Sequence, residues 1–222
     1  MMKSVFFGIV ALMFAAVVMQ QEQASAQFAD TNIAPPTDKW IYMEKSCTDK
    51  LQDQINKEFD AAIFYMQYAA YFSQFSVNLP GFADFFFHAA SEEREHGIKL
   101  VEYARMRGQT PIDKDKFLLN FAFENTKALK NLGDEELSKS AGLTALKAAL
   151  EKEEEVTKSI RELIKRCEND HNDYHLVDYL TGEFLEEQHQ GQRDLAGKFA
   201  MLTKMLETNP KLGEFMFDKQ KM

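Results

Sequence analysis

Four segments of the sequence carry metal-binding side chains inside stripes of otherwise apolar residues. The stripes advance by three, four or seven residues, a spacing that places their members on one face of an α-helix. The side chains that interrupt them are Glu58, Glu93, His96, Glu153 and Gln188. Burying a lone carboxylate is costly unless its charge is compensated, and bound cations compensate several carboxylates at once. The pattern therefore predicts a carboxylate-rich metal site inside a four-helix bundle.

Each stripe is defined by its own run of residues. The first consists of Leu51, Ile55, Glu58, Ala62, Tyr65, Ala69 and Phe72, the second of Phe82, Phe86, Ala89, Glu93, His96, Leu100 and Tyr103, the third of Leu146, Ala149, Glu153, Val156 and Ile160, and the fourth of Val177, Phe184, Gln188, Leu195 and Leu202. Because Tyr65 shares a face with Glu58, its hydroxyl could bond a metal ligand or a bound oxygen species. The alternative is an ordinary core tyrosine with a satisfied hydroxyl.

The sharpest local signal is the pair Glu93-x-x-His96, whose members share a helix face and can grip one metal. Such a pair on a surface helix usually faces solvent, but this one lies between Phe86 and Leu100 in an apolar stripe. Oxygen ligands with imidazole suit iron or manganese better than a thiolate metal, and a bridging Glu makes a dinuclear site natural. The inward direction of Glu153 is harder to assign, because it belongs to the charge run 151–155, most of which forms a solvated face.

A second Glu-x-x-His pair, Glu186 with His189, competes for the fourth helix. Glu186 lies two residues, about 200° at 3.6 residues per turn, from Gln188. Gln188 is in register with Phe184 and Leu195, so Gln188 is predicted to face inward and Glu186 outward.

Composition limits the class of protein. The chain has 222 residues with 45% hydrophobic residues, which suits one large domain, and its five Pro and ten Gly are few enough to favour helices. The net charge of −9, without a basic cluster beyond the N-terminus, makes nucleic acid an unexpected partner.

The first 26 residues read as a secretory signal peptide. Lys3 precedes an apolar run over 4–19, and Ala24-Ser25-Ala26 offers a small-residue cleavage site before Gln27. An uncleaved anchor is the alternative, but the run is shorter than the ~20 apolar residues that a spanning helix needs. No later segment is expected to cross a membrane. A polar arm follows over 27–39, and the remaining domain covers 40–222.

Breakers divide that domain into helices at about 40–76, 81–107, 141–168 and 174–208, with a short fifth helix over 211–217. The connection over 109–140 is long enough to run the length of the bundle, which makes the second and third helices parallel. Cys47, near the start of the first helix, and Cys167, near the end of the third, then fall at the same end. Along the oxidising secretory route, this predicts a disulfide.

The sequence resembles the heavy-type, ferroxidase-bearing subunit of animal ferritin, especially the secreted insect form, over about 40–219. The most specific stretches are Ala89-Ala90-Ser91-Glu92-Glu93-Arg94-Glu95-His96, His175-Leu176-Val177-Asp178-Tyr179, Glu186-Glu187-Gln188 and Leu212-Gly213-Glu214-Phe215-Met216-Phe217-Asp218-Lys219. The resemblance implies an all-α, ferritin-like four-helix bundle with a long crossover and a short fifth helix. It also implies a hollow shell of twenty-four subunits, mixed with light-type chains.

The resemblance further implies a ferroxidase that oxidises Fe(II) with dioxygen at a dinuclear iron centre and stores the ferric product. Glu58, Glu93 and His96 would hold the first iron, with Glu93 bridging and Glu153 holding the second. Gln188, also a metal-site residue, and Tyr65 would orient bound water or peroxide. A non-catalytic subunit of a secreted shell and a di-iron oxygenase acting on an organic substrate stay open as alternatives.

Two positions depart from the family pattern. The family often lines its three-fold pore with an Asp and a Glu one turn apart; Asp178 matches the Asp, but Thr181 stands in place of the Glu. Ile98 occupies a position near the mineral surface that is often acidic, which leaves Glu92 and Glu95 as weaker candidates there.

Overall fold

The computed structural model describes residues 43–108, 140–220 and 222. The predicted signal peptide, the polar arm and nearly all of the predicted crossover lie outside these residues. The helices are α2 (Lys45–Phe72), α3 (Pro80–Met106), α6 (Ala141–His171), α7 (Tyr174–Tyr179), the π-helix η4 (Leu180–Leu185), α8 (Glu186–Leu206) and α9 (Pro210–Gln220). The described ranges contain no strand and no helix long and apolar enough to cross a membrane.

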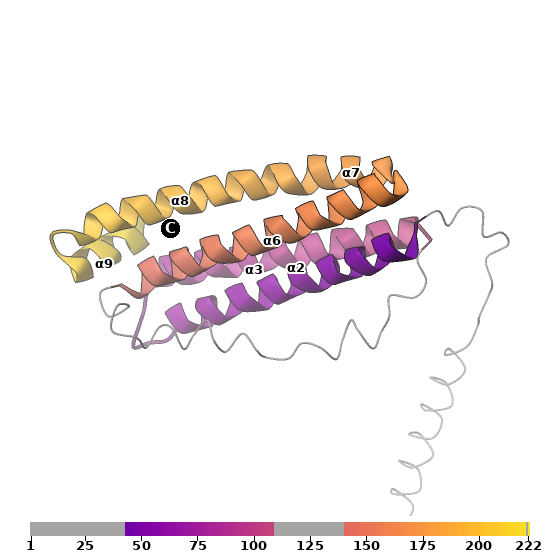
Figure 1. The fold of residues 1–222 in the computed structure, drawn as a ribbon. Coiled ribbons are helices and arrows are strands. Elements are labelled where there is room, and N and C mark those ends of the chain that lie inside the picture. The colour runs from indigo at the N-terminus through magenta and orange to yellow at the C-terminus, as the bar shows by residue number, and fades with distance from the viewer. Residues whose placement is uncertain (1–42, 109–139, 221) are drawn as a thin grey trace, which may run out of the picture. The chain divides into compact units, whose positions relative to one another are not determined.

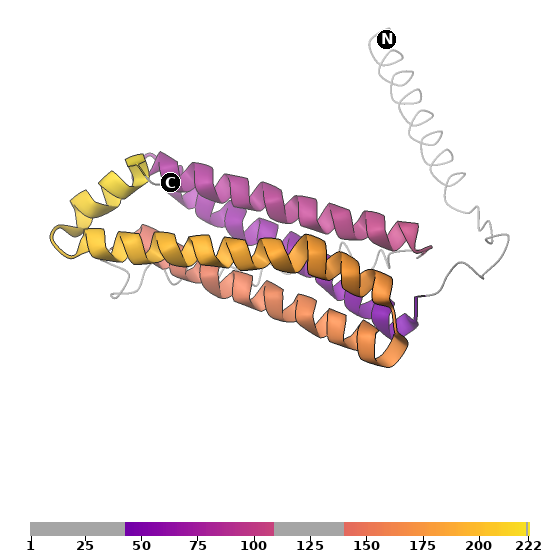
Figure 2. The ribbon, with the colours of Figure 1, turned by 90° about the horizontal axis from the view of Figure 1, so that it is seen from above.

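Four long rods make up the bundle. The helices α2, α3, α6 and the continuous run α7–η4–α8 lie lengthwise beside one another, and α9 folds back at the end where α8 finishes (Figures 1 and 2). The colours in Figure 1 show α3 and α6 running the same way and α2 and α6 running in opposite directions. This is the predicted arrangement of the first three helices.

The turn between α2 and α3 is longer than predicted. α2 ends at Phe72 rather than near residue 76, and the Ser73 hydroxyl donates to the Ala69 carbonyl at 2.8 Å. Asn78 takes a left-handed conformation with φ of 50°, and Pro80 opens α3, where its missing N–H costs nothing. Short polar residues and proline thus force the antiparallel reversal that sets α3 beside α2.

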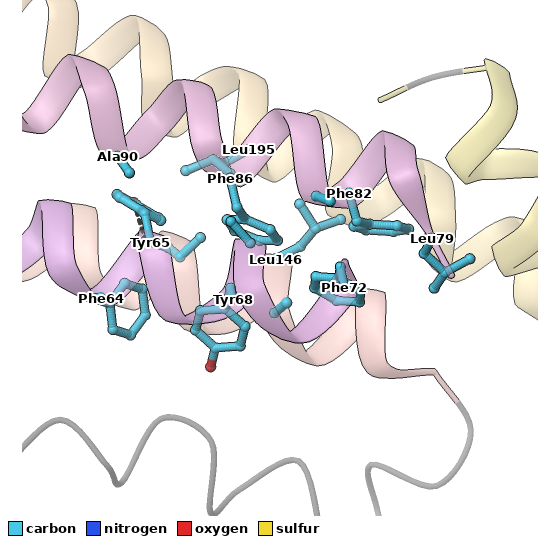
Figure 3. Packing of buried hydrophobic residues seen from close by; sticks show 14 of the residues in the cluster. Phe64, Tyr65, Tyr68, Phe72, Leu79, Phe82, Phe86, Ala90, Leu146 and Leu195 are labelled. Carbon is cyan, nitrogen blue, oxygen red and sulfur yellow. Dashed lines mark hydrogen bonds between the residues drawn. The ribbon is translucent and has the colours of Figure 1, made fainter. Parts of the chain in front are cut away.

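Stacked aromatic rings fill the half of the bundle near α9 (Figure 3). The ring centroid of Phe72 lies 5.0 Å from that of Phe82 and 5.7 Å from that of Phe86. The rings of Phe72 and Phe86 are nearly parallel, with an interplanar angle of 6°. These residues belong to the first and second predicted stripes, and all three are fully buried. The aromatic cluster holds α2 and α3 in the register that the polar side chains require.

A disulfide ties the opposite half together, as predicted. Cys47 on α2 and Cys167 on α6 are bonded, fully buried, and their Cα atoms lie 5.4 Å apart. The bond joins positions separated by 120 residues and fixes the end of α6 against the start of α2.

The fourth helix departs from the predicted phase because it contains the π-helix η4. Its buried residues recur every fourth position, at Leu176, Leu180, Phe184 and Gln188. A π-turn bonds residue i to i+5 and is wider than an α-turn, so more residues are needed to return to the same face. The prediction that Val177 belongs to the buried stripe was therefore wrong; Val177 is half-buried, as are Ala62 and Ala89 in the earlier stripes.

The predicted fifth helix exists, and two of its carboxylates cap other helices. Asp218 Oδ1 accepts from the Phe82 N–H at 2.9 Å at the start of α3. Glu214 Oε1 accepts from Ser140 Oγ and from the Gly142 N–H, both at 2.7 Å, at the start of α6. Negative groups at helix N-termini satisfy free N–H donors and oppose the helix dipole. α9 therefore fixes the ends of two helices that carry the polar stripes.

Candidate metal centre

Three predicted ligands meet in the middle of the bundle. One donor atom each from Glu58 on α2 and from Glu93 and His96 on α3 lies within 4.8 Å of the others, and all three side chains are buried. The antiparallel packing of α2 on α3 creates this cluster from residues that are far apart in sequence. Its donors, two carboxylates and one imidazole, match the oxygen-rich set that iron and manganese accept.

The donor atoms of this cluster are left without partners. Glu58 Oε2, Glu93 Oε2 and His96 Nδ1 are buried and bond no other group in the described part of the chain. The His96 Nδ1 atom lies 3.7 Å from Glu93 Oε2, beyond hydrogen-bond distance. Buried polar atoms are nearly always paired, so an unpaired buried atom on each of the three clustered residues fits a bound cation.

Burial and neighbouring negative charges raise the pKa values of the Glu58 and Glu93 carboxyl groups. The pKa of Glu58 is raised well above its usual value, by burial first and then by the charge of Glu93. The pKa of Glu93 is raised to about 8, again by burial first and then by the charge of Glu153. Without a cation, the cluster therefore keeps protons at neutral pH. A divalent ion would displace them, because it offers the positive charge that the site lacks.

Glu153 on α6 is oriented by hydrogen bonds on the far side of this cluster. The Tyr65 hydroxyl donates to Glu153 Oε1. Burial raises the pKa of Glu153, while hydrogen bonds from Tyr65 and Gln188 oppose that rise. Burial and the charge of Glu153 raise the pKa of Tyr65 well above its usual value, so the phenol stays protonated and remains a donor. The hydrogen bond from Tyr65 thereby fixes the orientation of the Glu153 carboxyl group near the cluster.

Sequence reasoning missed Gln54, one turn before Glu58. Gln54 is fully buried, and its Nε2 donates to Glu58 Oε1 at 2.7 Å. This bond occupies one carboxylate oxygen and leaves Oε2 for the cluster. The signal was a polar residue beside Ile55 at the i−4 position from Glu58, where helix neighbours meet.

Two further polar residues surround Gln188. Thr157 Oγ1 donates to Gln188 Oε1 at 2.7 Å, and Gln192 Nε2 donates to Thr157 Oγ1 at 2.6 Å. Thr157 is buried next to Val156 of the third stripe, and Gln192 is half-buried one turn beyond Gln188. Neither residue belongs to a predicted stripe, so neither was singled out from the sequence.

A cavity of ≈ 340 Å³ borders the centre between α3 and α8. Its inner wall includes Glu93, His96 and Glu153, and its outer wall includes the exposed Glu92 and Glu187. Glu187 Oε2 lies 3.3 Å from His96 Nε2, a contact that the phase argument did not foresee. The cavity thus connects the buried ligands to solvent along an acidic wall.

The remaining predicted side chains lie away from the centre. Glu186 and His189 are exposed, as the phase argument predicted. Asp178 and Thr181 are exposed near the α7–η4 junction, and the Thr181 hydroxyl donates to the Val177 carbonyl at 2.6 Å. Ile98 is also exposed.

Comparison with known proteins agrees with this architecture. A protein-family model described as a ferritin-like domain matches residues 48–205. The chain is 55% identical to the ferritin heavy chain of Aedes aegypti over 222 residues, covering 100% of both chains. It is 48% identical to the ferritin heavy chain of Drosophila melanogaster over 213 residues, covering 95% of this chain and 97% of that one.

A solved structure extends the likeness to three dimensions. The crystal structure of the secreted ferritin of Trichoplusia ni superposes with a TM-score of 0.72 at 45% identity, covering 86% of this chain and 96% of that chain.

Proposed function

The chain belongs to the ferritin family, and from that premise we propose that it is the ferroxidase subunit of an iron-storage shell. Its substrates are Fe(II) and dioxygen, and its product is ferric iron deposited as mineral. The observation that carries the proposal is the buried cluster of Glu58, Glu93 and His96, each of which keeps one buried polar atom without a partner among the described residues.

Each ligand has one task in the proposed centre. Glu58 and His96 hold the first Fe(II), Glu93 bridges, and Glu153 holds the second Fe(II). Three carboxylates bring three negative charges, which two divalent ions more than balance, so ion binding removes the repulsion that keeps the free site protonated.

The chain's role in the redox step is positioning. Each of two Fe(II) ions gives up one electron, and dioxygen accepts both. Gln54 orients Glu58, and Tyr65 orients Glu153, so the carboxylates need little rearrangement when the ions arrive. Tyr65 and Gln188 lie beside the position of the second ion, where they orient bound water or oxygen.

The walls of the cavity favour a ferroxidase over the alternative of a di-iron oxygenase. Beyond the expected ligands, the cavity wall carries three more carboxyl groups, Glu92, Glu187 and Asp194, together with Lys198 and the apolar Phe85 and Leu195. An acidic wall attracts cations, whereas a site for an organic substrate is usually apolar. The intact ligand set in turn argues against a non-catalytic shell subunit.

We further propose a shell of twenty-four subunits that includes light-type chains, and a secretory destination. The predicted signal peptide over 1–26 and the polar arm over 27–39 support secretion, and the buried Cys47–Cys167 disulfide suits an oxidising compartment. Asp178 is proposed to line a three-fold pore of that shell, a role carried over by resemblance.

Aerobic addition of Fe(II) to the purified protein tests the proposed function. We expect rapid growth of ferric absorbance and particles that retain the mineral inside an assembly of constant outer size. If iron is oxidised no faster than in buffer, the ferroxidase assignment fails. If oxidation is fast but the ferric product precipitates outside the protein, the storage assignment fails.

A further inference from the structure

A chain of side-chain hydrogen bonds ends at Gln188 and determines which of its amide atoms faces the centre. Its members come from α6 and α8, and none is an expected iron ligand apart from Gln188 itself. The chain begins at the backbone carbonyl of Glu153, which accepts from Gln192 Nε2 at 3.1 Å. Since a carbonyl can only accept, this bond fixes the Gln192 amide with its nitrogen toward α6.

The next bond fixes the hydroxyl of Thr157. Gln192 Nε2 also donates to Thr157 Oγ1, at 2.6 Å. A helical threonine commonly donates to the carbonyl four residues earlier, which here is that of Glu153. Here the Thr157 oxygen accepts from the Gln192 amide, and its single hydroxyl proton is donated instead to Gln188 Oε1 at 2.7 Å.

The last link concerns the amide nitrogen of Gln188. With Oε1 engaged by Thr157, the NH₂ group is the part of Gln188 left to face the centre, and Gln188 opposes the rise in the pKa of Glu153, as a donor near that carboxylate does. The reverse orientation would set an amide oxygen against a carboxylate, two acceptors with no proton between them. Thr157 and Gln188 are both buried, so water does not compete for these bonds.

We propose that Thr157 and Gln192 are positioning residues that hold Gln188 with its amide nitrogen toward Glu153, so that Gln188 serves the centre as a hydrogen-bond donor and not as an iron ligand. This inference rests on the proposed dinuclear centre. It replaces the sequence expectation that Gln188 belongs among the metal ligands. The donor orients the carboxylate of Glu153, which holds the second ion, while Glu58 and His96 at the first ion are untouched.

Calorimetric titration with Zn(II), which is redox-inert, tests the proposal without turnover. The wild-type chain should bind two ions at the centre, one tightly through Glu58, Glu93 and His96 and one more weakly through Glu153. Thr157→Val keeps the shape of the side chain and removes the hydroxyl. We expect this variant to bind the second Zn(II) ion about 10-fold more weakly and the first ion with unchanged affinity. Losing a group that orients a metal ligand typically lowers metal affinity by that factor.

Two more variants separate positioning from packing. Thr157→Ser restores the hydroxyl and should return the second affinity to within about twofold of wild type, a recovery that a packing role would not produce because Ser lacks the methyl group. Thr203→Val is the matched control, since the Thr203 hydroxyl is exposed and donates to the Phe199 carbonyl of its own helix at 2.8 Å. Both affinities should stay unchanged in this variant.

The outcomes distinguish the two proposals. If the wild-type chain binds no pair of ions at the centre, the proposed function itself fails. If the wild type binds two ions and Thr157→Val binds both as tightly, or loses both equally, the positioning role is wrong while the centre stands. A crystal structure of the Zn(II)-bound wild type with Gln188 Oε1 coordinated to the metal would also overturn the inference.

Discussion

Glu58 on α2 and Glu93 on α3 are two buried carboxyl groups that each place one ligand atom within 4.8 Å of the other. Burial raises the pKa of both groups, and that of Glu93 reaches about 8, so Glu93 keeps a proton at neutral pH when no cation is present. A divalent ion supplies the positive charge that lets this proton leave. The site is therefore built to exchange protons for metal ions.

Metal binding should strengthen with pH for this reason. The pKa of Glu93 is raised from its ordinary 4.5 to about 8. Between these values the folded chain binds more protons here than the unfolded chain does, so the metal-free protein loses stability as pH rises. Zn(II) replaces the proton, and we expect the rise in Tm that it causes to be larger at pH 8 than at pH 6.

Paired thermal unfolding curves with Zn(II) and with a chelator, at pH 6, 7 and 8, measure this effect. Glu58→Gln with Glu93→Gln provides the control, because neutral amides do not titrate in this range and bind the ion only weakly. A Zn(II) shift in the wild type that is independent of pH would show that the carboxyl groups are already ionised in the metal-free protein.

The disulfide should contribute to stability but not to catalysis. Cys47 and Cys167 close a loop with a sequence separation of 120 and lie at the end of the bundle away from the aromatic cluster around Phe72. Replacing both with Ser should lower the unfolding free energy by roughly 2–4 kcal/mol, the usual range for a native bridge. Denaturant unfolding measures the loss. An unchanged midpoint in the variant, or two free thiols in the unreduced wild type, would contradict the expectation.

The cap that α9 places on α3 should be measurable as well. Asp218→Ala removes the acceptor of the Phe82 N–H, and we expect a loss of about 1 kcal/mol, as for other helix caps. Asp218→Asn keeps an acceptor oxygen and should lose less. Asp53→Ala, at an exposed carboxylate 3.7 Å from Lys50, is the control and should be near neutral. Equal unfolding midpoints for Asp218→Ala and Asp53→Ala would show that the cap does not contribute to stability.

The sequence predicts the bundle and the ligands because both depend on helical periodicity. Glu58, Glu93 and His96 interrupt apolar stripes at positions that the core must bury, and the structure brings them together. The charge run 151–155 made the direction of Glu153 harder to predict. Its stripe neighbours nevertheless place it on the inner face, and it is buried. Periodicity shows which face is inside, and the unusual residues on that face indicate chemistry.

Periodicity could not predict the π-helix or the hydrogen bonds. The π-helix η4 changes the helical phase within the fourth helix. For that reason the sequence pattern predicted Val177 to be buried, whereas Leu176 is the buried residue. Gln54, Thr157 and Gln192 act through bonds to neighbours on other turns or helices, and their type alone does not distinguish them from surface polar residues. Glu187 reaches His96 from a half-exposed position that no stripe includes.

Cation uptake should respond to the missing acidic residue at Thr181. Thr181 is exposed, and among the described residues its hydroxyl bonds just the Val177 carbonyl of its own helical run, so Glu fits there at little structural cost. If Asp178 lines a narrow pore, Thr181→Glu adds a second ring of charge and should speed iron oxidation at low Fe(II) and low salt, with little effect at saturating iron. Stopped-flow rates across iron and salt concentrations measure this. Superimposable curves for the two proteins would mean that this pore does not limit uptake.

The most direct test of the centre is the initial rate of aerobic Fe(II) oxidation, followed by stopped-flow absorbance, in the double variant Glu58→Ala, His96→Ala. The matched control is Glu186→Ala, His189→Ala, which removes the exposed Glu-x-x-His pair on α8. We predict that the first variant oxidises iron more than about tenfold slower than wild type while still assembling, because it loses two of the ligands to the first ion. The control should match wild type. An assembled Glu58→Ala, His96→Ala variant that oxidises Fe(II) at the wild-type initial rate would contradict the assignment of the centre.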